Sequence, residues 1–158
     1  MAVLEDVTNV LKGILSDHPA VEETLTMILS SPLLGRETIS AALGELSEHL
    51  IAKAIGGARI ARGNRGFDLI GPSEERIEVK SRQIGRWGDT LQFNFSKHTE
   101  QAHTVYCIAW DNTEEGDRPS LRAAYRIDVP ELLRRWGTPN QSSYAARTNL
   151  GLLKKAFA

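Results

Sequence analysis

Two carboxylates and one ammonium stand close together in a part of the chain rich in strand-forming residues. Asp68 lies within the apolar segment 66–70, and Glu78 and Lys80 alternate with apolar residues in the segment 77–82. Alternation with a period of two is typical of a strand that packs on one face, so Glu78 and Lys80 should point the same way. Glycine and proline between the segments indicate a turn, and the resulting hairpin would bring Asp68 beside Glu78. This combination predicts metal-dependent phosphodiester hydrolysis, because carboxylates bind Mg²⁺ and an ammonium can polarise water or stabilise phosphate charge.

The expected metal ligands follow from this arrangement. Asp68 and Glu78 are the anchors, and the main-chain carbonyl of Val79 is a further candidate ligand. A helix expected just before these strands carries two more acidic residues. Of these we prefer Glu48 to complete the metal shell, directly or through water, and Glu45 is the alternative. The expected cofactor is Mg²⁺, with Mn²⁺ as a substitute.

An aspartate followed about ten residues later by Glu-x-Lys between apolar neighbours resembles the motif of the PD-(D/E)XK nuclease superfamily, which has the restriction-endonuclease-like fold. The matching residues are Asp68, Glu78 and Lys80, and a preceding acidic helix is also usual in that family. The resemblance covers roughly residues 40 to 111. Phe67 stands where the name of the motif has proline, a residue that many relatives lack. The resemblance implies a metal-dependent endonuclease that acts on DNA, in restriction, phage defence or repair.

The next expected strand, 91–96, carries apolar residues on one face and Gln92, Asn94 and Ser96 on the other. If this strand neighbours the one that holds Glu78, its amides lie beside the metal and can orient water or phosphate. Gln92 is the preferred catalytic member of this group.

Basic side chains stand on loops and strand ends around the same region, where they could follow a nucleic-acid backbone. The candidate nucleic-acid-binding residues are Arg62, Arg65, Arg82, Arg86 and Lys97. Trp87 has two interpretations. It could stack on a base or enter a groove, or it could simply cover the edge of the core.

The order of elements predicts an α/β fold with a restriction-endonuclease-like mixed central sheet flanked by helices. Helices are expected at residues 3–15, 20–29, 37–55, 128–136 and 150–157. Strands are expected at 58–61, 67–70, 76–81, 91–96, 104–110 and 121–127, and 137–149 is expected to be a turn-rich tail. Prolines break the first helices. We therefore assign residues 1–36 to a helical N-terminal extension and 37–158 to a nuclease-like core.

Two finer expectations concern which side chains share a face. In the first strand of the hairpin, Phe67 and Leu69 should face opposite to Asp68. In the helix 37–55, one buried stripe is expected. Its members are Leu43, Leu46, Leu50 and Ala54.

Composition and charge are those of a soluble globular protein of one domain, with 158 residues, 41% hydrophobic and 25% charged. The net charge of −1 conceals an asymmetry, because residues 1–52 carry a net −6, residues 53–103 a net +3 and residues 104–158 a net +2. Positive charge therefore gathers around and after the candidate site, where a phosphate backbone would lie. The start of the chain is acidic and no apolar run is long enough to span a membrane, so we expect a cytoplasmic protein without a membrane partner.

Two functions from different classes remain open. The first is an endonuclease that acts on DNA, with RNA as an open alternative, since the catalytic machinery would be the same. The second is a subunit that binds nucleic acid or assembles with partners without cutting. A chain this short has little surface for reading a long sequence, so we expect a homodimer or a protein partner bound through the N-terminal helices.

Overall fold

The computed structural model describes residues 3–34, 36–59, 67–111 and 119–158. Three helices follow a first short strand, and most of the strands come after them. In order they are β1 (Leu4–Asp6), α1 (Thr8–Ser16), α2 (Pro19–Ser30), α3 (Arg36–Ile55), β2 (Ala58–Arg59), β3 (Leu69–Ile70), β4 (Arg76–Gln83), the 3₁₀ turn η1 (Gly85–Thr90), β5 (Gln92–Ser96), the 3₁₀ turn η2 (Lys97–Gln101), β6 (Thr104–Asp111), β7 (Ser120–Asp128), α4 (Val129–Trp136), β8 (Tyr144–Asn149) and α5 (Leu150–Ala156).

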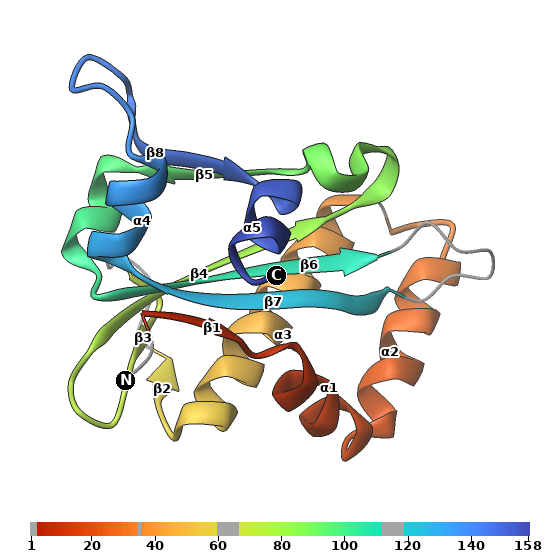
Figure 1. Ribbon diagram of the computed structural model, residues 1–158. Helices are drawn as coiled ribbons and strands as arrows, with labels where there is room; N and C mark the ends of the chain where they lie inside the picture. Colours follow the sequence, from red (N-terminus) through yellow and green to blue (C-terminus); the bar gives the residue numbers. More distant parts are fainter. Residues whose placement is uncertain (1–2, 35, 60–66, 112–118) are drawn as a thin grey trace.

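The centre of the molecule is a mixed six-stranded sheet with the order β1-β7-β6-β4-β3-β2. β4 and β6 run parallel, and the other neighbouring pairs are antiparallel. Helices α1, α2 and α3 cover one face of this sheet, whereas α4, α5 and a second sheet made of β5 and β8 cover the other (Figure 1). The predicted α/β fold with a mixed central sheet is confirmed, and its restriction-endonuclease-like identity stays a prediction.

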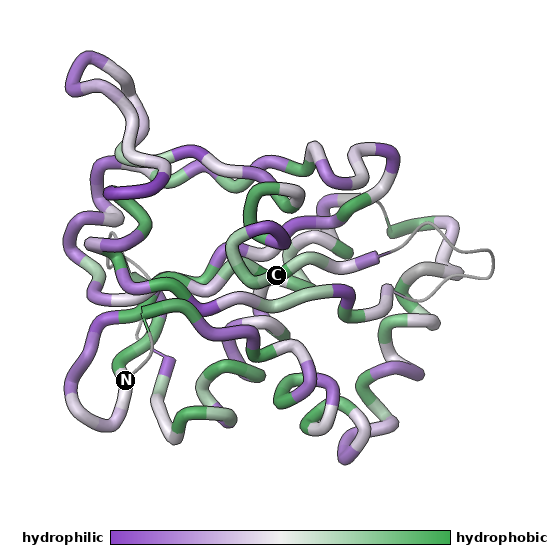
Figure 2. Tube along the Cα trace, in the orientation of Figure 1, coloured by the Kyte–Doolittle hydropathy of each residue, from purple (hydrophilic) through white to green (hydrophobic). Residues whose placement is uncertain are grey.

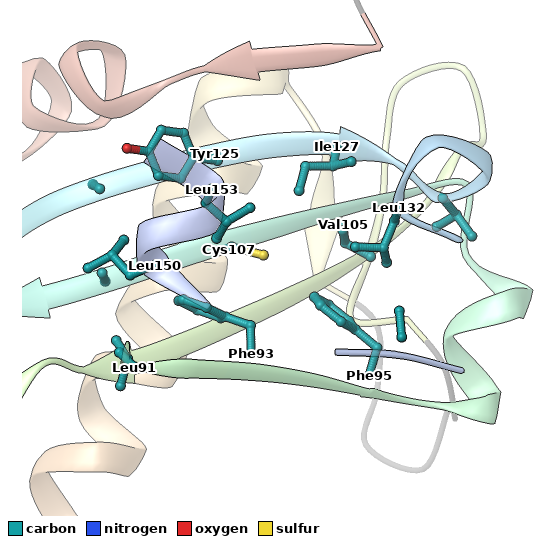
Figure 3. Close-up of a cluster of buried hydrophobic side chains, with 14 of the residues drawn as sticks. Leu91, Phe93, Phe95, Val105, Cys107, Tyr125, Ile127, Leu132, Leu150 and Leu153 are labelled. Atoms are coloured by element: carbon teal, nitrogen blue, oxygen red, sulfur yellow. The ribbon is translucent and has the colours of Figure 1, made fainter. Parts of the chain in front are cut away.

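Each face of the central sheet has its own apolar core, because alternate residues of the buried strands point to opposite sides. On the helical side, Ile108 and Trp110 of β6 pack among side chains of α1 and α3. On the other side, Val105 and Cys107 of the same strand pack against Phe93 and its neighbours (Figure 3). Along the chain trace, hydrophobic residues occur both in the central strands and in the helices α1, α2 and α3, while the projecting loop between α4 and β8 is mostly hydrophilic (Figure 2).

The N-terminal residues belong to the same sheet and core as the rest of the described chain. A helix was expected from residue 3, but residues Leu4–Asp6 form an edge strand that pairs with β7, and α1 begins at Thr8. Leu11 and Leu15 of α1 are buried in the core on the helical side. The segment assigned to a helical extension, residues 1–36, therefore also completes the central sheet.

Helix α3 buries a different stripe from the one expected. Leu43 and Leu50 are buried as predicted, but Ala54 is exposed and Ser47 is fully buried. A polar residue fits this position because the Ser47 hydroxyl donates to the carbonyl of Leu43 and accepts the indole N–H of Trp110, at 2.9 Å. Hydrogen bonds therefore satisfy both polar groups in the core.

The end of α3 sets the position of the first strands. Gly56 adopts a positive φ of 72°, the left-handed conformation that glycine reaches most easily, and so ends the helix. A Cβ atom on Gly57 would lie 2.8 Å from the carbonyl oxygen of Ile70, so only glycine allows β2 to pass this close to β3. This tight turn brings the carboxylates of α3 next to the β3–β4 hairpin.

The strand β8 falls in the segment expected to be a turn-rich tail. It pairs antiparallel with β5, and it alternates buried residues such as Ala146 and Thr148 with the exposed Arg147. Small and polar residues dominate this strand, which has only Tyr144 and Thr148 of the aromatic and β-branched types that indicate strands. Within the described residues, no helix combines the length and apolar character needed to cross a membrane.

Candidate active site

The predicted hairpin forms, and it brings Asp68 beside the part of β4 that carries Glu78. Leu69 of β3 pairs with Ile77 of β4, and Asp68 stands directly before β3. The Asp68 N–H donates to the carbonyl of Ile77 at 2.7 Å, and its carboxylate Oδ2 accepts the N–H of Val79 at 2.8 Å. Asp68 is therefore held against β4 by two hydrogen bonds, one from its backbone and one to its side chain.

The expectation that Phe67 and Leu69 share one face is wrong. Phe67 packs against the core under β5 and β8, whereas Leu69 is buried in the core on the helical side. The regular strand begins only at Leu69, and the chain bends at Asp68. A bend breaks the alternation of side chains, which holds only in extended backbone.

Glu78 is the most deeply buried acidic side chain of the site, with a relative exposure of 7%. Its Oε2 accepts the hydroxyl of Thr99 at 2.6 Å, and its Oε1 lies 3.3 Å from the ammonium nitrogen of Lys80. Burial raises the pKa of Glu78 and the Asp68 carboxylate raises it further, while Thr99 and Lys80 act in the opposite direction. Glu78 and Lys80 share one side of β4, as the alternation predicted.

Glu48 of α3 interacts electrostatically with Asp68 of this hairpin. Burial raises its pKa, and the next largest contribution is repulsion from Asp68. Its Oε2 accepts a hydrogen bond from Nε of Arg59 at 3.1 Å and forms an ion pair with Nη2 of the same residue at 3.0 Å. Glu45 is far more exposed, at 63% of its side chain against 21% for Glu48. Of the two alternatives, the geometry favours Glu48.

A cleft of about 750 Å³ holds Glu48 and Lys80 together with candidate nucleic-acid-binding residues, whereas Asp68 and Glu78 are not among the residues that line it. Its walls are α3, β4 and η1. The lining residues are Ser40, Leu43, Gly44 and Glu48 from α3, residues 79–83 from β4, Gly85, Arg86 and Trp87. The cleft therefore brings together six residues that the sequence singled out for chemistry or binding: Glu48, Val79, Lys80, Arg82, Arg86 and Trp87.

Gln92 and Lys97, like Asp68 and Glu78, do not line this cleft. β5 pairs with β8 and not with β4, so the condition on which Gln92 was chosen is not met. The Gln92 amide oxygen instead accepts from Arg147 at 3.4 Å. Lys97 begins η2, at the opposite end of β5 from η1, and does not line the cleft. Arg62 and Arg65 lie outside the described residues.

Two residues that the sequence analysis did not select contact the site carboxylates directly. Thr99 is fully buried in η2 and donates to Glu78, and Arg59 of β2 pairs with Glu48. Neither belongs to a motif, and both reach their partners from another element. The sequence offered one sign of the Arg59 contact: Arg59 follows Gly56-Gly57-Ala58, and a glycine turn at the end of a helix can direct the next residues back along that helix.

The oxygen donors of the site residues are chemically suited to a hard divalent cation. Carboxylate and carbonyl oxygens are the ligands that Mg²⁺ and Mn²⁺ prefer, and Asp68, Glu48, Glu78 and the carbonyl of Val79 supply them. Repulsion between Asp68 and each of the two glutamates is a cost that a bound cation would relieve. Among the described residues, no three acidic, histidine or cysteine side chains are already arranged to hold a metal ion. In this structure Arg59 and Lys80 neutralise the two glutamates.

The raised pKa of Glu78 predicts how stability depends on pH. A carboxyl with a raised pKa keeps its proton in the folded state where the unfolded chain, near its ordinary value of 4.5, has already released it. Stability should therefore fall as the pH rises from about 4.5 through the raised pKa. Glu78→Gln removes this titration. The free energy of unfolding of the variant minus that of the original protein should therefore increase as the pH rises from 4 to 8. Urea unfolding at several pH values measures this difference.

The control for this prediction is Glu100→Gln, which removes an exposed carboxylate of η2. Its stability relative to the original protein should change less with pH than that of Glu78→Gln. Parallel stability profiles for Glu78→Gln and the original protein across this pH range would contradict the assignment of Glu78 as a destabilising buried carboxylate.

No protein-family model matches this chain, and no curated protein matches its sequence.

Proposed function

We propose that this chain is a metal-dependent endonuclease that hydrolyses phosphodiester bonds of DNA. The observation that carries the proposal is the proximity of Asp68, Glu78, Lys80 and Glu48 around the β3–β4 hairpin. Beside them lies a cleft to which β4 and η1 supply the cationic and aromatic side chains Lys80, Arg82, Arg86 and Trp87. The motif that resembles PD-(D/E)XK nucleases supports the same function. Restriction, phage defence or repair in the cytoplasm is the setting we expect.

Each residue has a role in this proposal. Asp68, Glu78, Glu48 and the carbonyl of Val79 would hold Mg²⁺, which when bound lowers the pKa of water and neutralises phosphate charge. Lys80 would orient the attacking water or stabilise charge on the phosphate, and its position in the cleft wall beside Glu78 supports this role. Arg82 and Arg86 would bind the phosphate backbone.

The contact with a partner belongs to the same proposal. We expect a homodimer or a protein partner on the side of the N-terminal helices, where Met27 and Leu33 are 73% and 92% exposed. Two copies would place two active sites on two strands of DNA.

A second candidate is a subunit on the same fold that binds nucleic acid without cutting. The observation that favours it is that protein groups already neutralise the glutamates: Arg59 pairs with Glu48, and Lys80 and Thr99 bind Glu78. Such a protein would keep the basic cleft and need no metal.

Incubation of the purified protein with plasmid, linear duplex and single-stranded DNA separates the two candidates. Mg²⁺, Mn²⁺ and a chelator are compared, and Asp68→Asn is run beside the original protein. Cutting that requires metal and disappears in the variant supports the endonuclease. Binding without cutting supports the second candidate, and equal traces of cutting in both proteins indicate contamination.

Arg59 should oppose metal binding, because its guanidinium occupies the carboxylate of Glu48. Arg59→Gln is expected to tighten Mn²⁺ binding by about fivefold, since a positive charge a few ångströms from a cation costs roughly 1 kcal/mol at a partly exposed site. Isothermal titration with Mn²⁺ measures the affinity. Arg134→Gln, which breaks an ion pair with Glu131 on α4, is the matched control and should leave it unchanged. Weaker Mn²⁺ binding in Arg59→Gln would show that Arg59 supports the site.

A further inference from the structure

The turn η1 exposes a tryptophan at the end of the cleft. Trp87 has a relative exposure of 54%, and it belongs to neither of the two buried core clusters. A large aromatic ring normally buries most of its surface, because each ångström squared of apolar area left in water costs free energy. Of the two interpretations of Trp87, covering the core edge is therefore not the one this geometry supports.

The backbone beneath Trp87 is firmly held. The N–H of Trp87 donates to the carbonyl of Ile84, and the hydroxyl of Thr90 donates to the carbonyl of Trp87 at 2.6 Å. Asp89 accepts from Lys154 of α5 at 2.6 Å, and Ile84 is buried. The turn thus presents its ring outward from a fixed base, which lowers the entropy that a ligand would have to remove on binding.

The ring is continuous with the cationic part of the cleft. The guanidinium carbon of Arg86 lies 5.1 Å from the centre of the Trp87 ring, and both side chains line the cleft with Lys80 and Arg82. A guanidinium and an indole are flat surfaces on which nucleobases stack, and the cations beside them attract phosphates.

We propose that Trp87 and Arg86 form a stacking site for an unpaired nucleobase of single-stranded DNA. Bases inside a duplex already stack on their neighbours, so an indole that enters a groove must first unstack a base step, whereas it meets an unpaired base without that cost. The substrate of the cleft is then a single strand, or a DNA in which the strand next to the scissile phosphate is unpaired. This inference rests on the proposed function for its link to cleavage.

Binding measured in a chelator tests the site without any cutting. The probes are a labelled oligo(dT) of about 12 nucleotides, within the usual footprint of single-strand-binding sites, and a blunt duplex of the same length, followed by fluorescence anisotropy at fixed salt. Trp87→Ala should weaken binding of the single strand about tenfold and leave duplex binding unchanged. Trp87→Phe should keep most of the affinity, because phenylalanine still stacks.

Tyr144→Ala is the matched control. Arg147 lies over the Tyr144 ring at 5.0 Å, so this pair resembles Arg86 and Trp87 but sits on β8 away from the cleft. Tyr144→Ala should leave binding of the single-stranded oligonucleotide unchanged. Equal weakening of single-strand and duplex binding by Trp87→Ala, or no weakening at all, would overturn the stacking site.

The outcome is independent of the cleavage assay. If the protein never cuts but Trp87→Ala selectively loses oligo(dT), the endonuclease proposal fails and the stacking site stands. If the protein cuts with Mg²⁺ but Trp87→Ala binds oligo(dT) normally, the stacking site fails and the endonuclease proposal stands.

Discussion

Replacing Lys80 with methionine should slow metal-dependent DNA cleavage by at least about 100-fold, the usual contribution of a positioned acid-base or electrostatic group. Methionine keeps a flexible apolar stem of similar length but removes the ammonium that lies 3.3 Å from Glu78 and faces the cleft. Binding of DNA through the arginines of the cleft should change little. The loss is therefore expected in the single-turnover rate, measured with saturating protein and Mg²⁺.

Two further variants define what Lys80 contributes. Lys80→Arg keeps the positive charge but cannot release a proton near neutral pH, so it should recover only part of the rate if Lys80 exchanges a proton with water. Lys53→Met removes an exposed lysine of α3 and should cleave normally. Thermal unfolding of each variant confirms that the fold persists. A Lys80→Met protein that cuts at the original rate would remove Lys80 from the mechanism.

The local part of the site could be predicted from sequence because it depends on neighbours in the chain. Alternation places Glu78 and Lys80 on one side of a strand, and a short turn brings Asp68 back beside that strand, where it bonds to the backbone of Ile77 and Val79. Even there the prediction of faces was wrong at Phe67, because the chain bends at Asp68. Whether these residues cut DNA remains a prediction.

The contacts that complete the site depend on distant elements, and the sequence carries little sign of them. Thr99 reaches Glu78 across 21 positions of the chain, and Arg59 reaches Glu48 only because two glycines reverse the chain after α3. Gln92 was chosen on the assumption that β5 lies beside β4, but strand order is a tertiary property that alternation does not determine.

The same limit applies to the edges of the fold. The long buried strands β6 and β7 were predicted because they are rich in apolar and β-branched residues, whereas β1 and β8 are short and largely polar. An edge strand such as β1 buries little side-chain surface, and its partner strand supplies its hydrogen bonds. No glycine or proline separates its three residues from α1. The sequence therefore predicted a single helix that spans both segments.

Truncating Phe93 to alanine should lower the free energy of unfolding by about 3–5 kcal/mol, the range found when a buried aromatic ring is removed. Phe93 is fully buried, and its ring packs between the central sheet and α5 together with Phe95 (Figure 3). Among the described strands, β5 and β8 pair with each other and with no strand of the central sheet. Apolar packing therefore carries most of the attachment of this second sheet, and urea unfolding followed by circular dichroism measures its loss.

The effect of Phe93→Ala should reach the site through the two turns that β5 joins. η1 precedes β5 and carries Trp87, while η2 follows it and holds Thr99 against Glu78. Leu33→Ala, at a residue that is 92% exposed, is the control and should change stability by less than about 0.5 kcal/mol. A loss of less than about 1 kcal/mol in Phe93→Ala would mean that the second sheet is held by something other than its buried rings, and the placement of both turns would then need another physical basis.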